Sequence, residues 1–168
     1  EKWAQRKKDE LSTDKQILAI STKSKEKVKN WPTEQWSKLI QELLPYYFIV
    51  QLGDHNEPKF EYVKRYAGEL SMRESAAILS LTDHFIGPDS LLMHIANGLD
   101  ISSTIIFGGS RPVNCFGYRQ NVNLSNSPEC SPCWIHDGYD VCKNDLVCMA
   151  NITTSQISSS LIPKLINQ

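Results

Sequence analysis

The stretch that decides the fold is residues 87–98, which read Gly87-Pro88-Asp89-Ser90-Leu91-Leu92-Met93-His94-Ile95-Ala96-Asn97-Gly98. It follows Phe85-Ile86, a short apolar segment typical of the end of a buried strand. Asp89 or Ser90 is a suitable N-cap, the residues after them supply an apolar face, and Gly98 is a natural helix stop at C′. The stretch therefore predicts a strand that runs directly into a helix.

The start of this predicted helix is polar and faces the edge of the sheet. A helix that begins where a strand ends leaves unpaired N–H groups pointing toward the crevice, and these favour a phosphate or another anion. The carboxylate of Asp89 would repel a phosphate but would accept hydrogen bonds from hydroxyl groups. The combination suits a ligand that carries both groups, such as a sugar attached to a phosphate. An ordinary capped helix in an α/β core is the alternative that these residues leave open.

Short apolar segments alternate with amphipathic ones along the chain. We expect strands at residues 17–20, 46–52, 62–63, 85–86, 103–107 and 120–124. Further helices are expected from Thr33 as N-cap, from Ser71 in the capping box Ser71-Met72-Arg73-Glu74, and over residues 152–166, where Pro163 bends or ends the helix. This alternation predicts an α/β fold with a Rossmann-like, doubly wound, mostly parallel sheet and flanking helices.

Length and charge limit the classes of function. A chain of 168 residues forms one ordinary domain with a sizeable core. The net charge of −1 gives no indication of nucleic-acid binding, and no apolar run is long enough for a membrane span. We expect a single domain over residues 1–168, in which 1–16 form a linker helix, 125–150 a cysteine-rich loop and 151–168 a C-terminal helix. The start at Glu1, within a polar helical pattern, suggests a piece of a longer protein.

Three polar or glycine-rich loops follow expected strands, at Ser21–Lys29, Gly87–Ser90 and Gly108–Ser110. Ligands of open parallel sheets bind beyond the carboxyl ends of the strands, where these loops meet. The sequence has no Gly-x-Gly-x-x-Gly after its first strand and no P-loop, which excludes the usual dehydrogenase and P-loop nucleotide sites. The ligand is therefore expected on a loop of lysines and hydroxyls together with a helix terminus.

Four of the five cysteines lie close together in the sequence, namely Cys130, Cys133, Cys142 and Cys148, whereas Cys115 stands apart. Their spacing is that of a four-cysteine structural site for zinc or iron. Two disulfides are the alternative in an exported protein, and free thiols are a third. Four thiolates would fill a tetrahedral site, so no catalytic metal is expected there.

Several short motifs occur in one order with regular gaps, and together they resemble glycosyltransferase family 9, the heptosyltransferases of bacterial lipopolysaccharide biosynthesis and their relatives. They are Lys29-x-Trp31-Pro32, Leu70-Ser71-Met72-x-Glu74, Asp89-Ser90-x-x-Met93-His94-Ile95-Ala96 and Phe107-Gly108, followed by the late cysteines. The resemblance runs from about Ile17 to the end of the chain. It implies the C-terminal half of a GT-B enzyme, whose two Rossmann-like domains enclose the active site.

In this family the C-terminal domain holds the nucleotide-diphospho-sugar donor, commonly ADP-heptose, and the N-terminal domain holds the acceptor and the catalytic base. The resemblance thus implies an inverting, metal-independent transferase whose catalytic residues lie outside this chain, so that the chain alone would be inactive. The expected partners are the donor and the N-terminal domain of the same protein. The expected location is the cytoplasm, including the inner face of the membrane through the full-length protein. A non-catalytic nucleotide- or sugar-binding module and a metal-stapled interaction domain remain the alternatives.

The resemblance also assigns roles to individual residues. It places the donor phosphates near Ser21 and Thr22, with Lys29 as their countercharge, and sugar hydroxyls on Asp89. The remaining expected contacts are the backbone N–H groups around Ser90 and Leu91, an apolar contact of Leu70 with the base, and His94, which either reaches the phosphate or sugar or packs in the core.

Two positions depart from the family pattern. The family usually has Gly-Pro or a similar small pair where this chain has Leu91-Leu92, and the leucine adds a side chain where the donor should lie close. Gly109-Ser110 stands where Pro and Thr are more usual after Phe-Gly. The identity of the donor is therefore less constrained than the binding of a donor.

Overall fold

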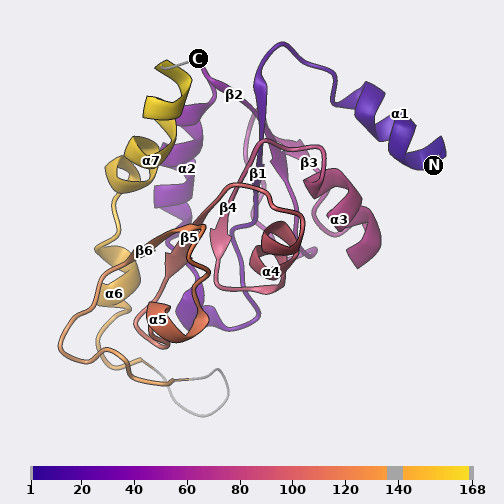
Figure 1. Cartoon of the computed structure of the whole chain (residues 1–168). Coiled ribbons are helices and arrows are strands. Elements are labelled where there is room, and N and C mark those ends of the chain that lie inside the picture. The colour runs from indigo at the N-terminus through magenta and orange to yellow at the C-terminus, as the bar shows by residue number, and fades with distance from the viewer. Residues whose placement is uncertain (1, 136–141, 167–168) are drawn as a thin grey trace.

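The computed structural model describes residues 2–135 and 142–166. Its centre is a six-stranded sheet in the order β3-β2-β1-β4-β5-β6, in which every neighbouring pair is parallel (Figure 1). The strands are β1 (Gln16–Ile20), β2 (Tyr47–Gln51), β3 (Lys64–Arg65), β4 (His84–Pro88), β5 (Ser103–Phe107) and β6 (Val122–Ser125). The predicted Rossmann-like, parallel α/β fold is confirmed.

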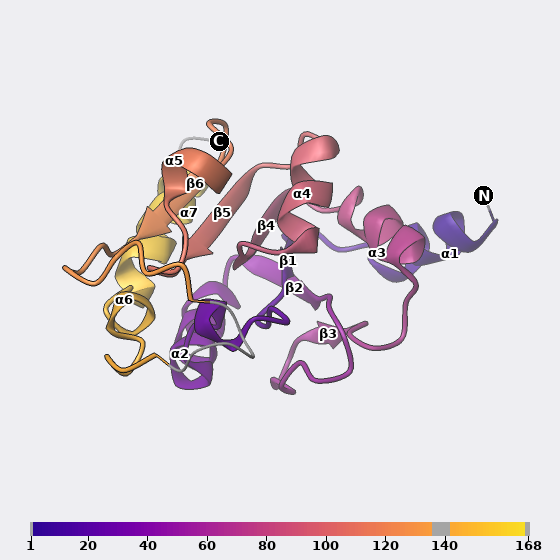
Figure 2. The same cartoon turned by 90° about the horizontal axis from the view of Figure 1, so that it is seen from below.

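Helices cover both faces of this sheet, as Figure 2 shows from below. One face carries α2 (Thr33–Leu43), α6 (Val147–Ala150) and α7 (Thr154–Ile166). The other carries α1 (Lys2–Glu10), α3 (Met72–Leu79), α4 (Leu91–Gly98) and the short α5 (Val113–Phe116). Successive strand residues contribute to opposite layers: Leu18 and Ile20 pack under α2, whereas Ala19 lies under α3 and α4. Burial on both faces explains why the central strands read as continuous apolar runs.

The strand order places the ends of β1 and β4 side by side, although 60 or more residues separate them in the sequence. The N–H of Ser21 donates to the carbonyl of Ile86 at 3.1 Å, so the loops that follow these two strands begin next to each other. The chain runs outward from β1 to β3 in one direction and from β4 to β6 in the other. A crevice at such a reversal point is the usual ligand position in this class of sheet.

Local capping rules predicted some helix ends and not others. The capping box at Ser71 is present, with the Ser71 hydroxyl accepting from the N–H of Glu74 and the Glu74 carboxylate accepting from the N–H of Ser71. Thr33 is not the N-cap of α2: Pro32 takes that position, because its carbonyl accepts the first helical hydrogen bond from Trp36. Gly98 is still helical, and the left-handed residue after α4 is Asp100, with φ 56°.

Two further strand boundaries differ from the sequence-based expectation. The expected strand at 62–63 lies at Lys64–Arg65 instead, because Tyr62 has φ 61° and cannot continue a strand. The last strand begins at Val122, because a turn closes just before it through the N–H of Asn121 and the carbonyl of Tyr118. The helix α7 ends at Ile166 as expected, so Pro163 does not end it.

The N-terminal helix α1 is attached to the edge of the sheet by charged contacts. Glu10 forms ion pairs with Lys7, at 2.5 Å, and with Lys64 of β3. The ammonium of Lys7 also lies 4.8 Å from the centre of the Tyr66 ring. In the ranges that the structure describes, no helix is both long and apolar enough to cross a membrane.

Candidate functional site

A cavity of about 610 Å³ opens at the carboxyl ends of β1, β2 and β4. Its volume lies within the range of roughly 300–1,000 Å³ that is usual for small-molecule sites. Six of the eight residues expected to bind a ligand line it, namely Ser21, Lys29, Leu70, Asp89, Ser90 and Leu91. Thr22 and His94 are not among the lining residues. The fold therefore gathers most of the predicted site from three separate segments of the chain.

The loop after β1 forms a compact set of hydrogen-bond donors, which we call the strand-end nest: the hydroxyls of Ser21 and Thr22 and the backbone N–H groups of Thr22 and Lys23. All of these groups donate to the carboxylate of Glu57. The distances are 3.0 Å from Ser21 Oγ, 2.9 Å from the N–H of Thr22 and 3.1 Å from the N–H of Lys23. The strand-end nest is thus an anion-binding arrangement of the kind that holds phosphates, and here it holds a side chain of the same protein.

Glu57 reaches the strand-end nest from the loop after β2. The residue is 4% exposed, and its carboxylate also accepts from Gln51 Nε2 at 3.3 Å. Gly53 makes room for it, because a Cβ at residue 53 would lie 2.4 Å from Glu57 Oε1. No sequence motif indicates Glu57. The parallel pairing of β1 with β2 brings their loops to one edge, but no local pattern shows which acid reaches across.

Lys29 ends the short 3₁₀ helix η1 (Lys27–Lys29), which carries its side chain into the crevice. The ammonium lies 3.0 Å from Asp89 Oδ2, 3.3 Å from the Asp89 carbonyl oxygen and 3.4 Å from Glu26 Oε1. The Lys29 and Asp89 side chains are 9% and 8% exposed. The two residues predicted to contact phosphate and sugar are therefore paired with each other.

Glu26 links this pair to a second cation that the sequence analysis did not single out. Arg111, on the loop after β5, places Nη2 3.4 Å from Glu26 Oε1. The Arg111 guanidinium also lies 5.0 Å from the centre of the Phe116 ring. A chain of alternating charges, Arg111–Glu26–Lys29–Asp89, thus connects the three loops at the carboxyl ends of β5, β1 and β4.

Helix α4 begins at the edge of the cavity with Ser90 as its N-cap, and the Ser90 side chain makes no capping hydrogen bond. Leu91 is 54% exposed and lines the cavity, so the bulky residue that departs from the family pattern does lie at its mouth. Leu70 and the exposed Met72 also line the cavity and supply apolar surface. The site therefore has a charged part beside Lys29 and an apolar part beside Leu70.

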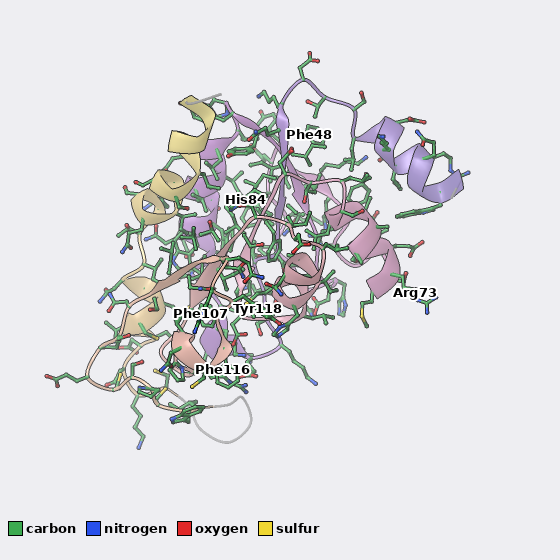
Figure 3. The ribbon with its side chains drawn as sticks, viewed as in Figure 1. Phe48, Arg73, His84, Phe107, Phe116 and Tyr118 are labelled. Carbon is green, nitrogen blue, oxygen red and sulfur yellow. The ribbon has the colours of Figure 1, made fainter. Side chains whose placement is uncertain are left out.

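His94 points to a different neighbour. Its Nδ1 lies 2.9 Å from the hydroxyl of Tyr118, whose side chain is labelled in Figure 3, and the two rings meet edge to face at 5.7 Å. His94 is exposed, and Tyr118 belongs to the segment between α5 and β6. The structure thus neither brings His94 into the cavity nor buries it in the core.

The four late cysteines all line one small cavity of about 30 Å³ beside Gly109 and Ser110. All five cysteines of the chain are free thiols, and Cys148 is the buried one. Burial raises the pKa of the Cys148 thiol, while hydrogen bonds from the backbone of Gly109 and Met149 act in the opposite direction. Within the described ranges, no three His, Cys, Asp or Glu side chains are grouped closely enough to hold a metal ion. The four thiols line one cavity and are suitable metal donors, but in this structure they do not lie close enough together to coordinate one ion.

Gly109 explains why the cysteine-rich segment can approach the sheet. A Cβ at residue 109 would lie 3.1 Å from Cys148 Cβ and 3.2 Å from Ser131 Cβ. The Gly109 carbonyl also accepts from the N–H of Cys133 at 3.0 Å and from Ser131 Oγ at 3.1 Å. The glycine that departs from the family pattern therefore packs under the cysteine-rich segment rather than against the large cavity.

The sequence matches the model of glycosyltransferase family 9 (heptosyltransferase) over residues 1–137. This range includes all six strands and every residue that lines the large cavity. A comparison with curated proteins finds no match.

Several solved structures have the same fold. The iron-containing dodecameric glycosyltransferase TibC from enterotoxigenic E. coli H10407 is 22% identical, with a TM-score of 0.76, over 94% of this chain and 48% of that one. The ADP-heptose LPS heptosyltransferase II of E. coli is 16% identical, with a TM-score of 0.76, over 99% and 51%. The E. coli heptosyltransferase WaaC with ADP is 17% identical, with a TM-score of 0.68, over 95% and 48%. This chain spans about half the length of these proteins.

Proposed function

Because this chain belongs to glycosyltransferase family 9, the heptosyltransferases, we propose that its large cavity binds the nucleotide-diphospho-sugar donor of a sugar transfer. The observation that carries the proposal is the position of Lys29 and Asp89 in a cavity of about 610 Å³, at the point where the strand order reverses. TibC and WaaC are described with ADP-D-beta-D-heptose and ADP respectively, which supports an ADP-linked donor for this chain as well.

The charged part of the cavity suits the diphosphate. The three close contacts of the Lys29 ammonium are the Asp89 carboxylate, the Asp89 carbonyl and the more distant Glu26 carboxylate. A phosphate oxygen would replace the Glu26 contact most easily, because it is the longest and the Glu26 side chain is 25% exposed. The Asp89 contacts would keep the ammonium in place during that exchange.

A cation at this position also serves the reaction. When the bond between the sugar carbon and the diphosphate oxygen breaks, its electrons remain on the leaving diphosphate, whose negative charge increases. A lysine held against the diphosphate stabilises this charge in the transition state more than in the ground state. We assign this role to Lys29, with the base and the acceptor supplied by a second domain of a GT-B enzyme.

The remaining parts of the donor follow from the same arrangement. Asp89 shares the cavity with Lys29 and accepts hydrogen bonds from sugar hydroxyls. Leu70 and Met72 line the same cavity, and we assign this apolar surface to the flat face of the base.

Calorimetric titration of the chain with ADP and with AMP tests this assignment. ADP should bind about tenfold or more tightly than AMP, because its second phosphate gains a charged hydrogen bond worth about 1.5–3 kcal/mol. Comparing the affinities of GDP and UDP with that of ADP shows how strongly the apolar surface at Leu70 and Met72 discriminates between bases. Equal affinity for AMP and ADP, or no binding of either, would contradict a diphosphate site.

The cysteines support a second role, as ligands of a structural metal. We infer that Cys130, Cys133, Cys142 and Cys148 bind zinc or iron, because all four face one cavity and because TibC is described as iron-containing. A metal held by four thiolates would cross-link the cysteine-rich segment to the sheet beside Gly109. The ion would have no open coordination position for catalysis.

A further inference from the structure

The strand-end nest directs two N–H groups and two hydroxyls at one anion, and a side chain of the protein already fills it. The Glu57 carboxylate receives two backbone N–H groups and two hydroxyls from the loop Ser21–Lys23. None of the ion pairs between described residues involves Glu57. Its charge is therefore balanced by amide and hydroxyl dipoles, which are the groups that also bind phosphates.

This contact borders the large cavity, although Glu57 and Thr22 do not themselves line it. Ser21, whose hydroxyl donates to Glu57, lines the large cavity together with Lys29. Gly53, Asp54 and His55, which precede Glu57 in its loop, line the cavity as well. A phosphate that approaches Lys29 and the Ser21 loop therefore meets Glu57 as a competing anion, and both cannot accept the same N–H groups.

The segment just before Glu57 lies outside the hydrophobic core. Residues 54–56 are exposed, so the segment in front of Glu57 buries little apolar surface. The loop is closed at its base by the hydrogen bond from the N–H of Gly68 to the carbonyl of Gly53 at 3.0 Å. Gln51 donates to the Pro58 carbonyl at 2.8 Å, a contact that does not involve the Glu57 side chain.

We propose that Glu57 is an internal anion that closes the strand-end nest, and that binding of a diphosphate is coupled to release of Glu57 from Ser21, Thr22 and Lys23. The proposal rests on the proposed function, since it assigns a competitor to the phosphate end of the same cavity. In the closed form the nest has no donor left for a ligand. In the open form the phosphate takes the N–H and hydroxyl groups, and the Glu57 carboxylate moves to solvent at the rim.

The test uses inorganic pyrophosphate, which binds to the phosphate end without help from a base or sugar. In Glu57→Gln the side chain keeps its shape, but its amide NH₂ group cannot accept hydrogen bonds from the N–H and hydroxyl donors of the nest. The closed form is therefore less stable in this variant. If the closed form predominates about ten to one, the variant should bind pyrophosphate roughly five- to tenfold more tightly than the wild type. Glu61→Gln is the matched control, because it removes the same charge from an exposed position of the same loop.

Two outcomes would overturn the proposal: equal or weaker pyrophosphate binding by Glu57→Gln, or an equal gain in Glu61→Gln, which would mean a general effect of charge. Amide hydrogen exchange in the wild type gives a second reading that needs no variant. Saturation with pyrophosphate should speed exchange in residues 54–60, and unchanged or slower exchange there would contradict release. If the variant binds pyrophosphate more tightly but the protein does not bind ADP, the proposal for Glu57 stands and the proposed nucleotide site is contradicted.

Discussion

The Lys29 ammonium lies 3.0 Å from Asp89 Oδ2, although 60 residues separate the two in the sequence. Both side chains are more than nine-tenths buried, so each partner compensates the desolvation of the other. The cation proposed for the diphosphate and the carboxylate proposed for the sugar therefore form one unit. A ligand has to fit both charges, which favours a molecule with a phosphate and hydroxyl groups over a simple anion.

Lys29→Ala should weaken ADP binding by about 1.5–3 kcal/mol, the range for a hydrogen bond to a charged group. The single variant also leaves Asp89 as a buried unpaired charge, which costs about 3–5 kcal/mol of stability. The double variant Lys29→Ala/Asp89→Asn removes both charges, should recover most of that stability and should still bind ADP weakly. Calorimetry for binding and urea unfolding for stability separate the two effects.

Lys38→Ala is the matched control for this experiment, because Lys38 is an exposed lysine on α2 outside the cavity. Its substitution should leave ADP affinity within error of the wild type. An equal loss in Lys38→Ala would mean that the nucleotide binds to diffuse positive charge rather than to a site.

Asp89→Asn should distinguish the sugar from the nucleotide. The asparagine still offers one oxygen to sugar hydroxyls but loses the charged hydrogen bond, so affinity for ADP-heptose should fall by about 1.5–3 kcal/mol relative to the change for ADP. The two ligands are measured on the same variant, and any general loss of folding then affects both. Parallel changes for ADP and ADP-heptose would contradict a contact of Asp89 with the sugar.

The cysteines should carry about one zinc or iron per chain when the protein is purified under reducing conditions. Cys130→Ser should lower the metal content, whereas Cys115→Ser should not, and both residues are exposed, so neither change disturbs the core. Elemental analysis measures the content directly. Fully reduced protein without metal, or equal losses of metal in the two variants, would exclude the four-cysteine site. A mass lower than that of the reduced protein by about four protons would indicate two disulfides instead.

The attachment of α1 to the edge of the sheet should weaken at acid pH, because Glu10 becomes protonated there. Hydrogen bonds from Lys64 and Lys7 lower the pKa of Glu10 from 4.5 to about 2. Because the pKa is lower in the folded protein, the stabilisation is complete above pH 4.5 and is lost as the pH falls from 4.5 toward about 2. Glu10→Gln should remove this part of the pH dependence.

Amide hydrogen exchange of α1 measures this attachment across the acid range. Asp14→Asn is the control, because Asp14 is an exposed carboxylate outside the Glu10 contacts. If exchange in α1 has the same pH dependence in Glu10→Gln as in the wild type, the ion pairs of Glu10 do not hold the helix.

The sequence by itself determined the elements that depend on neighbouring residues. Ser103–Phe107 is a strand within its predicted bounds, and Ser71 forms the predicted capping box, because both depend on patterns a few residues long. Family motifs also placed Lys29 and Asp89 at one site. The helix ends at Thr33 and Gly98 were wrong, because the Pro32 carbonyl and the left-handed Asp100 are equally compatible with the local pattern.

The tertiary structure alone decided which groups share a partner. Glu57 reaches the strand-end nest across 34–36 residues, because the strand order sets the loop after β2 beside the loop after β1. His94 turns to Tyr118 because the segment between α5 and β6 packs beside α4. Propensity and capping act within one or two turns of the chain, whereas donors and acceptors at the edge of a parallel sheet are brought together by strand order. A sequence pattern therefore locates the candidate site, but only the folded sheet shows that its lysine and its nest already hold carboxylates.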